Sequence, residues 1–195
     1  MDGVAAAERP LDSVEPWTFE DLRSLPESLW RYEIVDGALL MTPPAGIWHE
    51  GVSDALRATL HSWLPTTLRV VGPVGVDLHP TYLIPDLVVI DGDAVRPGRD
   101  RAEPSELSLV VEVVSPGSQS TDRILKPAKY AAAGIPHFWR IETRPHTTLT
   151  AYRLPGGAST YTELGTWKVG DVARFTEPFA IEVPIADLEN AHQPG

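Results

Sequence analysis

Residues 83–90 read Leu-Ile-Pro-Asp-Leu-Val-Val-Ile, and residues 107–114 read Leu-Ser-Leu-Val-Val-Glu-Val-Val. Both stretches are rich in Val, Ile and Leu, and both have the length of one β-strand. The nearly continuous apolar sequence of residues 107–114 is typical of a strand buried at the centre of a sheet. Each stretch nevertheless carries one carboxylate, Asp86 or Glu112. An ionised acid in a buried strand costs free energy unless a partner compensates its charge.

A divalent cation is one such partner, and an arginine or the main chain is the alternative. Ligation by oxygen alone favours magnesium, manganese or calcium over zinc. Two acids on adjacent strands with a lysine nearby would form a site that cleaves phosphodiesters. There the metal would hold a nonbridging phosphate oxygen and lower the pKa of the attacking water.

The rest of the chain predicts an α/β domain. Asp36-Gly37 is a two-residue hairpin signal between two strand-like stretches, and residues 49–64 carry apolar side chains at helical spacing. Residues 121–133 have helical character and end at Gly134. Further strands are expected at residues 68–71, 75–78, 137–141, 148–154 and 161–164, and short helices near residues 18–26 and 184–190. We therefore expect one domain over residues 17–195, with a mixed sheet and helices packed on it, after a disordered segment over residues 1–16.

Composition excludes several classes of protein. With 195 residues, 43% of them hydrophobic and 22% charged, the chain is neither disordered nor a coiled coil. It has no cysteine and no stretch long enough to span a membrane, and its acidic N-terminus lacks the pattern of a secretion signal, so we expect a cytoplasmic protein. The net charge of −11 disfavours a general electrostatic clamp on nucleic acid. Eight of the 16 basic residues, however, lie within residues 96–145, which also contain Glu112.

Other catalytic chemistries have little support. The chain has no Gly-x-Ser-x-Gly elbow, no Gly-x4-Gly-Lys phosphate loop and no Gly-x-Gly-x-x-Gly fingerprint. Its six histidines show no close ligand spacing, which disfavours a zinc hydrolase.

Several short motifs, in their order and spacing, resemble the Uma-type restriction endonuclease family of the PD-(D/E)XK nuclease superfamily. The resemblance spans roughly residues 17–155. The motifs are Tyr32-Glu-Ile-Val-Asp-Gly37, His49 at the head of a helix, Pro85-Asp86, Glu112-Val-Val-Ser-Pro116, Asp122-x3-Lys126-x3-Tyr130 and Gly134-Ile-Pro-His-Phe-Trp139.

The resemblance implies a restriction-endonuclease-like core in which acids from adjacent strands bind Mg²⁺ or Mn²⁺. Asp86 would be the first metal ligand, Glu112 the second, and Val113 would contribute its main-chain carbonyl. Glu33 resembles an additional acid that such folds bring to the site. The matching position of His49 has no role that the resemblance assigns.

The superfamily pattern places a lysine two residues after the second acid, where this chain has Val114. In this family the lysine is found on the following helix, so Lys126 is the candidate, with Lys129 as the alternative. Pro127 inside a helix would remove a main-chain bond and cost ~3 kcal/mol. We therefore expect the helix to begin near Lys126, with Asp122 as its cap.

These observations predict a metal-dependent endonuclease that acts on DNA, in which paired cuts would suit a homodimer. The alternative is a noncatalytic dimeric module that binds nucleic acid or protein on the same fold. We expect the large aromatic residues Tyr130 and Trp139 to pack in the core.

Overall fold

The computed structural model describes residues 10–11, 15–115, 117 and 119–190. Most of the segment expected to be disordered, residues 1–16, lies outside these residues. Within them, no helix is both long and apolar enough to cross a membrane. The assignment of residues 17–195 to one domain stays a prediction.

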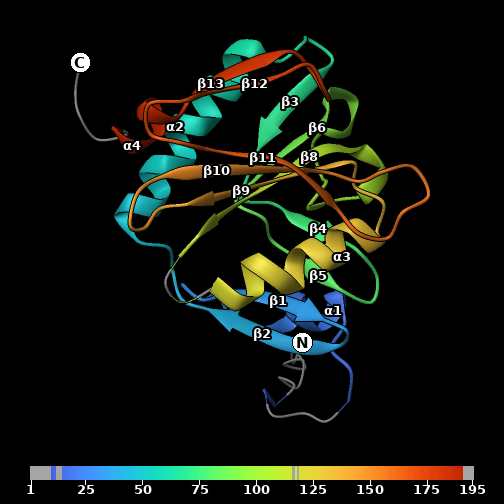
Figure 1. Cartoon of the computed structure of the whole chain (residues 1–195). Coiled ribbons are helices and arrows are strands. Elements are labelled where there is room, and N and C mark those ends of the chain that lie inside the picture. Colours follow the sequence, from blue (N-terminus) through green and yellow to red (C-terminus); the bar gives the residue numbers. More distant parts are fainter. Residues whose placement is uncertain (1–9, 12–14, 116, 118, 191–195) are drawn as a thin grey trace.

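A six-stranded sheet forms the centre of the molecule (Figure 1). Its central strands β8 and β9 are parallel, and every other neighbouring pair in it is antiparallel. The sheet is therefore mixed, as the sequence predicted. Its strands, in spatial order, are β11 (Thr162–Lys168), β10 (Thr148–Arg153), β9 (His137–Glu142), β8 (Leu107–Val114), β6 (Leu87–Asp91) and β3 (Leu68–Val71).

One face of this sheet is covered by helix α2 (Ile47–Trp63), which buries Val52, Leu56 and Leu60 against it. These residues recur every four positions and so form one stripe of the helix. The same face carries three further elements, β12 (Val172–Phe175), β13 (Ile181–Pro184) and α4 (Ile185–Glu189). The sequence predicted α2 and α4 within a few residues but assigned no strand to β12 or β13.

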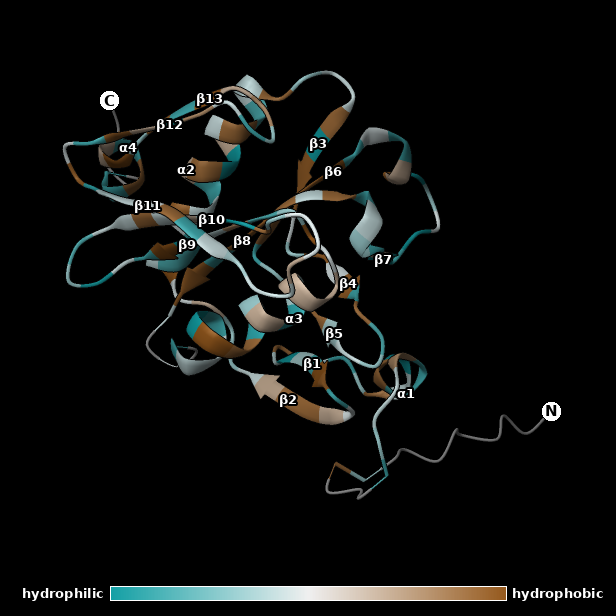
Figure 2. Cartoon of the chain, turned by 45° about the vertical axis from the view of Figure 1, so that its right-hand side comes forward, coloured by the Kyte–Doolittle hydropathy of each residue, from teal (hydrophilic) through white to brown (hydrophobic). Residues whose placement is uncertain are grey.

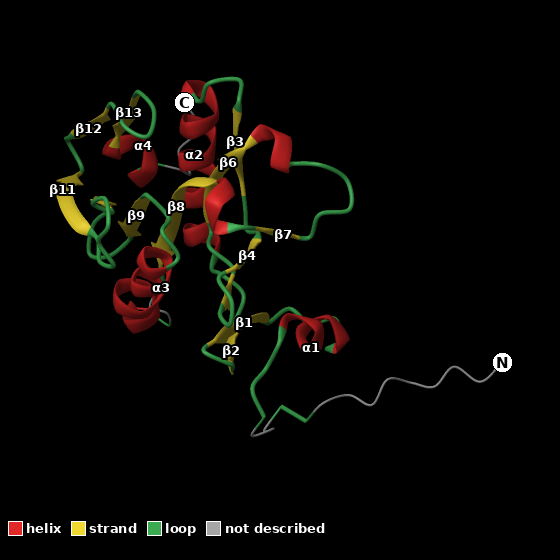
Figure 3. Ribbon diagram, turned by 90° about the vertical axis from the view of Figure 1, so that its right-hand side faces the viewer, coloured by secondary structure: helices red, strands yellow, loops and turns green. Residues whose placement is uncertain are grey.

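The opposite face is covered by helix α3 (Lys126–Ala132) and by a second sheet. Figure 3 shows α3 beside β8 and β9, with the hairpin of β1 and β2 beyond it. The second sheet contains, in spatial order, β2 (Ala38–Thr42), β1 (Arg31–Val35), β5 (Tyr82–Leu83), β4 (Gly75–Asp77) and β7 (Arg101–Ala102).

The hairpin forms where the sequence predicted it. Asp36 and Gly37 have φ angles of 50° and 82°, the left-handed conformation that a two-residue turn of this type requires. Helix α1 (Phe19–Ser24) precedes the hairpin and begins with a reciprocal capping box between Thr18 and Asp21. Two further short helices are η1 (Gly92–Ala94) and η2 (Pro104–Glu106).

The single strand expected over residues 83–90 is wrong. The chain leaves the second sheet after Leu83 and enters the central sheet at Leu87, so the two sheets are joined by Ile84, Pro85 and Asp86. Pro85 has no main-chain N–H, which disfavours a continuous central strand at this point. Asp86 therefore lies at the junction of the sheets rather than inside a strand.

Helix α3 begins at Lys126 with Pro127 in its first turn, as the sequence predicted, but the turn before it was not predicted. A π-helical turn, η3 (Thr121–Leu125), runs directly into α3, and the main-chain N–H of Lys126 bonds to the carbonyl of Thr121, five residues earlier. A proline cannot donate to the fourth carbonyl before it and its ring clashes there. The wider turn gives Pro127 room within a continuing helix.

Candidate active site

Asp86 is 5% exposed and is held by groups from three elements. Its Oδ1 accepts a hydrogen bond from Arg31 Nη1 of β1 at 3.1 Å. Its Oδ2 accepts one from the main-chain N–H of Val113 in β8 at 2.8 Å, and lies 3.1 Å from His49 Nε2 of α2. The alternative partners weighed for this acid, an arginine and the main chain, are both present.

These contacts determine the charge of Asp86. Burial alone would raise its pKa, but the hydrogen bond and charge of His49, the charge of Arg31 and the N–H of Val113 lower the pKa to about 2. In turn, burial lowers the pKa of His49, and the bond to Asp86 reverses this and raises it. The arrangement thus stabilises the carboxylate and the imidazolium together.

Glu112 projects from β8 toward α3 and is almost completely buried. Its Oε1 accepts a hydrogen bond from the hydroxyl of Tyr130 at 2.5 Å and lies 3.2 Å from Lys126 Nζ. Burial raises the pKa of Glu112 well above its usual value; Lys126 opposes this, and the nearby acids Asp86, Asp122 and Glu33 add to it. This part of the site therefore contains more carboxylate than its own cation can balance.

Lys126 is the cation at the centre of this group. Its Nζ lies 3.0 Å from Glu33 Oε1, 3.2 Å from Glu112 Oε1 and 3.7 Å from Asp122 Oδ1. Burial lowers the pKa of Lys126, but the surrounding carboxylates more than reverse this and raise it, so the amine is an ammonium ion. Glu33 also accepts a 2.7 Å hydrogen bond from the main-chain N–H of Ile84.

The structure separates the two candidate lysines. Lys129 Nζ bonds to the carboxylate of Asp36 at 2.6 and 2.7 Å, at the turn of the hairpin, and lies outside the group of buried acids. Lys126 therefore fits the expected position and Lys129 does not.

Two residues of the site were missed or misread. Asp122 is not a helix cap: it lies inside η3, is buried and faces Lys126. Arg31 was not identified at all. The signal available for it was the pair Arg31 and Glu33, two charged residues on the same side of a short strand that also carries Ile34 and Val35. Tyr130 and Trp139 are buried as expected.

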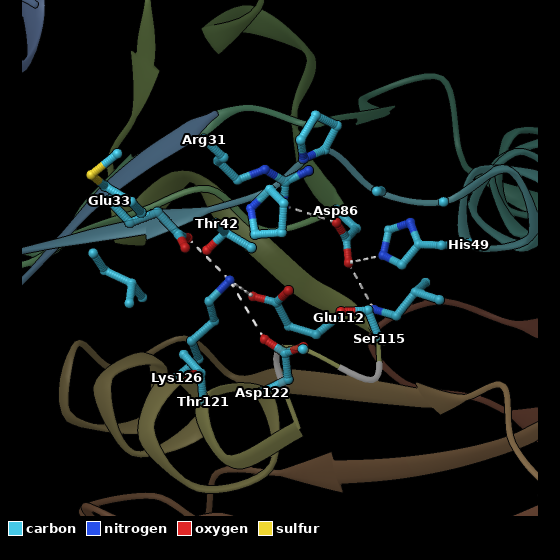
Figure 4. A pocket seen from close by; sticks show the side chains of 18 residues that line it. Arg31, Glu33, Thr42, His49, Asp86, Glu112, Ser115, Thr121, Asp122 and Lys126 are labelled. Carbon is cyan, nitrogen blue, oxygen red and sulfur yellow. Dashed lines mark hydrogen bonds and ion pairs between the residues drawn. The ribbon is translucent and has the colours of Figure 1, made fainter. Parts of the chain in front are cut away.

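The side chains of this site line a cavity of about 300 Å³. Figure 4 shows Asp86 with Arg31 and His49 on one side of it, and Lys126 with Glu33, Glu112 and Asp122 on the other. Its lining includes residues 43–46, which join β2 to α2. The hairpin, α2, β8 and α3 thus all contribute to one concave site.

Glu33, Asp86, Glu112 and Asp122 line this cavity, and their carboxylate oxygens are ligands that suit a hard divalent cation. Among the described residues, no group of three or more acids or histidines is arranged to hold a metal ion. A cation held by Asp86 and Glu112 would have to displace protein donors that these carboxylates now contact.

The mixed sheet with helices on both faces, and the two carboxylates at adjacent strands, define a nuclease fold of the restriction-endonuclease-like class. In agreement, the chain is similar to the crystal structure of a "putative nuclease belonging to DUF820" from Anabaena variabilis ATCC 29413, with a TM-score of 0.70 and 18% sequence identity. The match covers 90% of this chain and 99% of that one. At this identity the likeness shows the fold.

The family follows from the sequence itself. A family model, Uma2, described as "Putative restriction endonuclease", matches residues 19–186. The chain belongs to this family, which supports a nuclease-like function. No match was found among curated proteins.

Proposed function

We propose that this chain is a metal-dependent endonuclease that hydrolyses phosphodiester bonds in DNA. The observation that carries the proposal is the convergence of Asp86, Glu112 and the Lys126 ammonium on one cavity. The restriction endonuclease family supports DNA as the substrate. Paired cuts need two such sites, so the proposal includes a homodimer.

Asp86, Glu112 and the main-chain carbonyl of Val113 would hold Mg²⁺ or Mn²⁺. When bound, the ion supplies Lewis acidity toward a phosphate oxygen and lowers the pKa of water. Asp86 would enter as a carboxylate, because its pKa is lowered to about 2, and the ion would displace some of the donors that now hold it.

Lys126 provides positive charge that does not depend on pH in the neutral range, because its pKa is raised. It donates hydrogen bonds to the attacking water or to the charged oxygens of the transition state. Glu33 positions this ammonium by holding it at 3.0 Å while anchored to Ile84. Arg31 and His49 orient Asp86.

The test is cleavage of a supercoiled plasmid with Mg²⁺ or Mn²⁺, with a structured RNA in parallel. We expect the wild type to cut DNA and EDTA to stop it. Asp86→Asn, Glu112→Gln and Lys126→Met should lose the activity, whereas Lys129→Met, a matched change on the same helix outside the cavity, should keep it. Circular dichroism establishes that each variant is folded. Equal cutting by all proteins, or cutting in EDTA, would contradict the proposal.

One observation favours a second function, a noncatalytic module that binds nucleic acid or protein. Asp86 already has three protein partners and Glu112 has two, so the acids can serve as internal ion pairs. Thermal unfolding with Mg²⁺ separates the two functions. An ion that binds only the folded site stabilises it, by about 2.7 kcal/mol at one hundred times its Kd. Binding of nucleic acid with neither a Mg²⁺-dependent shift nor cleavage would assign the module.

A further inference from the structure

The hairpin and the start of α2 carry exposed apolar side chains to which the proposed chemistry assigns no role. Residues 37–49 are the longest stretch without Asp, Glu, Lys or Arg in a chain that is 22% charged. Figure 2 shows β2, which lies within it, coloured mostly as hydrophobic. Of the eleven large hydrophobic side chains exposed among the described residues, five fall between residues 29 and 48: Leu29, Trp30, Met41, Ile47 and Trp48. Exposed apolar groups concentrated in this way mark a contact surface.

The same region contains an open sheet edge. Strand β2 is the outer strand of its sheet and, among the described residues, pairs only with β1. Hydrogen-bonded and non-hydrogen-bonded pairs alternate outward from the two-residue turn, so the main-chain groups of Leu39 and Met41 point away from β1. Leu39 and residues 15–17 line one surface pocket. Met41 lies toward the other end of the strand. Exposed edges are commonly protected by a charge, a proline or a bulge, and β2 itself has none of these.

We propose that the β2 edge is the contact between two copies of this chain, with β2 pairing antiparallel to its counterpart about a twofold axis near Met41. In a twofold contact the residues close to the axis meet their own copies, so a charge placed there meets a like charge. Two chains of net charge −11 repel each other in general, and an uncharged stretch is where they approach at the least cost.

The composition of this surface also disfavours nucleic acid as the partner. Interfaces with nucleic acid are rich in Lys and Arg, which contact phosphates, and residues 37–49 contain neither. A second copy of β2 offers instead the outward N–H and C=O of its own Met41, which match those of the first.

The proposed pairing has one consequence for the cavity. Leu40, Met41 and Thr42 of β2 line it, so the two cavities of the dimer would lie on either side of the paired strands. Only this consequence rests on the proposed nuclease function; the contact itself does not.

The test measures molar mass by light scattering coupled to size exclusion, without metal or DNA. We expect the wild type to have twice the 21.3 kDa of one chain. Met41→Lys should return the protein to one chain, because it places two ammonium groups near the axis. Met41→Pro should do the same, because it removes an outward N–H and leaves the bonds to β1 in place. Leu164→Lys is the matched control: it adds the same charge to an exposed apolar residue on β11, the edge of the other sheet, and should stay dimeric.

Three results would overturn the proposal. The first is a wild type with the mass of a single chain. The second is a dimer that persists in both Met41 variants while circular dichroism shows them folded. The third is a Leu164→Lys variant that dissociates as fully as Met41→Lys. A monomeric wild type whose binding of single-stranded DNA is lost in Met41→Lys would assign the surface to nucleic acid. Because mass is measured without activity, failure of the nuclease proposal leaves this result unaffected.

Discussion

The two faces of the central sheet differ in composition although the same strands form both. Toward α2, strand β8 presents Leu109, Val111 and Val113 to a large cluster of apolar residues. Toward α3, it presents Val110 and Glu112, and the acid lies in a group of buried charges. Side chains of a strand alternate between faces, so one strand can stabilise the fold on one side and build a site on the other.

The contrast between the two faces indicates that the buried charges on the α3 side serve function rather than stability. Replacing a buried ion pair with well-packed apolar residues is often neutral or stabilising, whereas removing one partner alone is strongly destabilising. The buried group of Glu33, Glu112, Asp122 and Lys126 is therefore poorly explained by stability, and the apolar α2 face shows how this chain packs where no chemistry is needed.

The largest effect is expected at the centre of the charged face. Lys126→Met leaves three buried carboxylates without their ammonium and should lower the free energy of unfolding by about 3–5 kcal/mol above neutral pH. The loss should shrink on acidification, because Glu112, whose pKa is already raised, then binds a proton in the folded state more readily than in the unfolded state. Urea unfolding measures both. Lys129→Met removes a lysine that pairs with Asp36 at the surface and should unfold like the wild type. Equal losses of unfolding free energy in the two variants would show that the buried position of Lys126 is not what matters.

On the apolar face, a truncation should affect stability without affecting chemistry. Leu56→Ala opens a cavity between α2 and the sheet and should cost about 2–5 kcal/mol of unfolding free energy. Plasmid cleavage per folded molecule should remain that of the wild type when measured well below the melting temperature. A large fall in that specific activity would show that the two faces are not separate.

The third effect is a loss of folding stability in acid, which we expect from Asp86 and not from the apolar core. Its folded pKa of about 2 lies below the ordinary value of 3.8, so its ionised form contributes stability that is present above 3.8 and lost as the pH falls toward 2. The difference corresponds to about 2 kcal/mol. Urea midpoints measured across this range should fall more steeply for the wild type than for Asp86→Asn. Parallel curves would rule out this acid as a source of the pH dependence.

The smallest loss of stability is expected at Tyr130, whose ring packs in the apolar core and whose hydroxyl contacts the buried Glu112. Tyr130→Phe keeps the ring in the core and removes only the hydroxyl that donates to Glu112, which should cost about 1 kcal/mol. In a double-mutant cycle with Glu112→Gln, this cost should decrease, because the acceptor is no longer a carboxylate. An unchanged cost would indicate that the hydroxyl acts through some other contact.

Much of the fold was predictable because its signals are local. The apolar runs, the Asp36-Gly37 turn and the stripe of α2 each lie within a few residues, and each formed within a few residues of the expected bounds. The break before Leu87 and the strands β12 and β13 were not predicted. Whether an apolar stretch continues in one sheet or crosses to another depends on which strands lie beside it, and this is a property of the whole fold.

The sequence by itself determined which acids are unusual, because the cost of a carboxylate can be judged from the apolar residues around Asp86 and Glu112. Only the tertiary structure decided which groups meet them. Arg31 is 55 residues from Asp86 in the chain, and Lys126 rather than Lys129 reaches the buried acids because Glu33, on a distant strand, lies beside it. The physical reason is range: burial is encoded in neighbouring residues, whereas the partner of a buried charge is set by strand pairing and helix packing across the molecule.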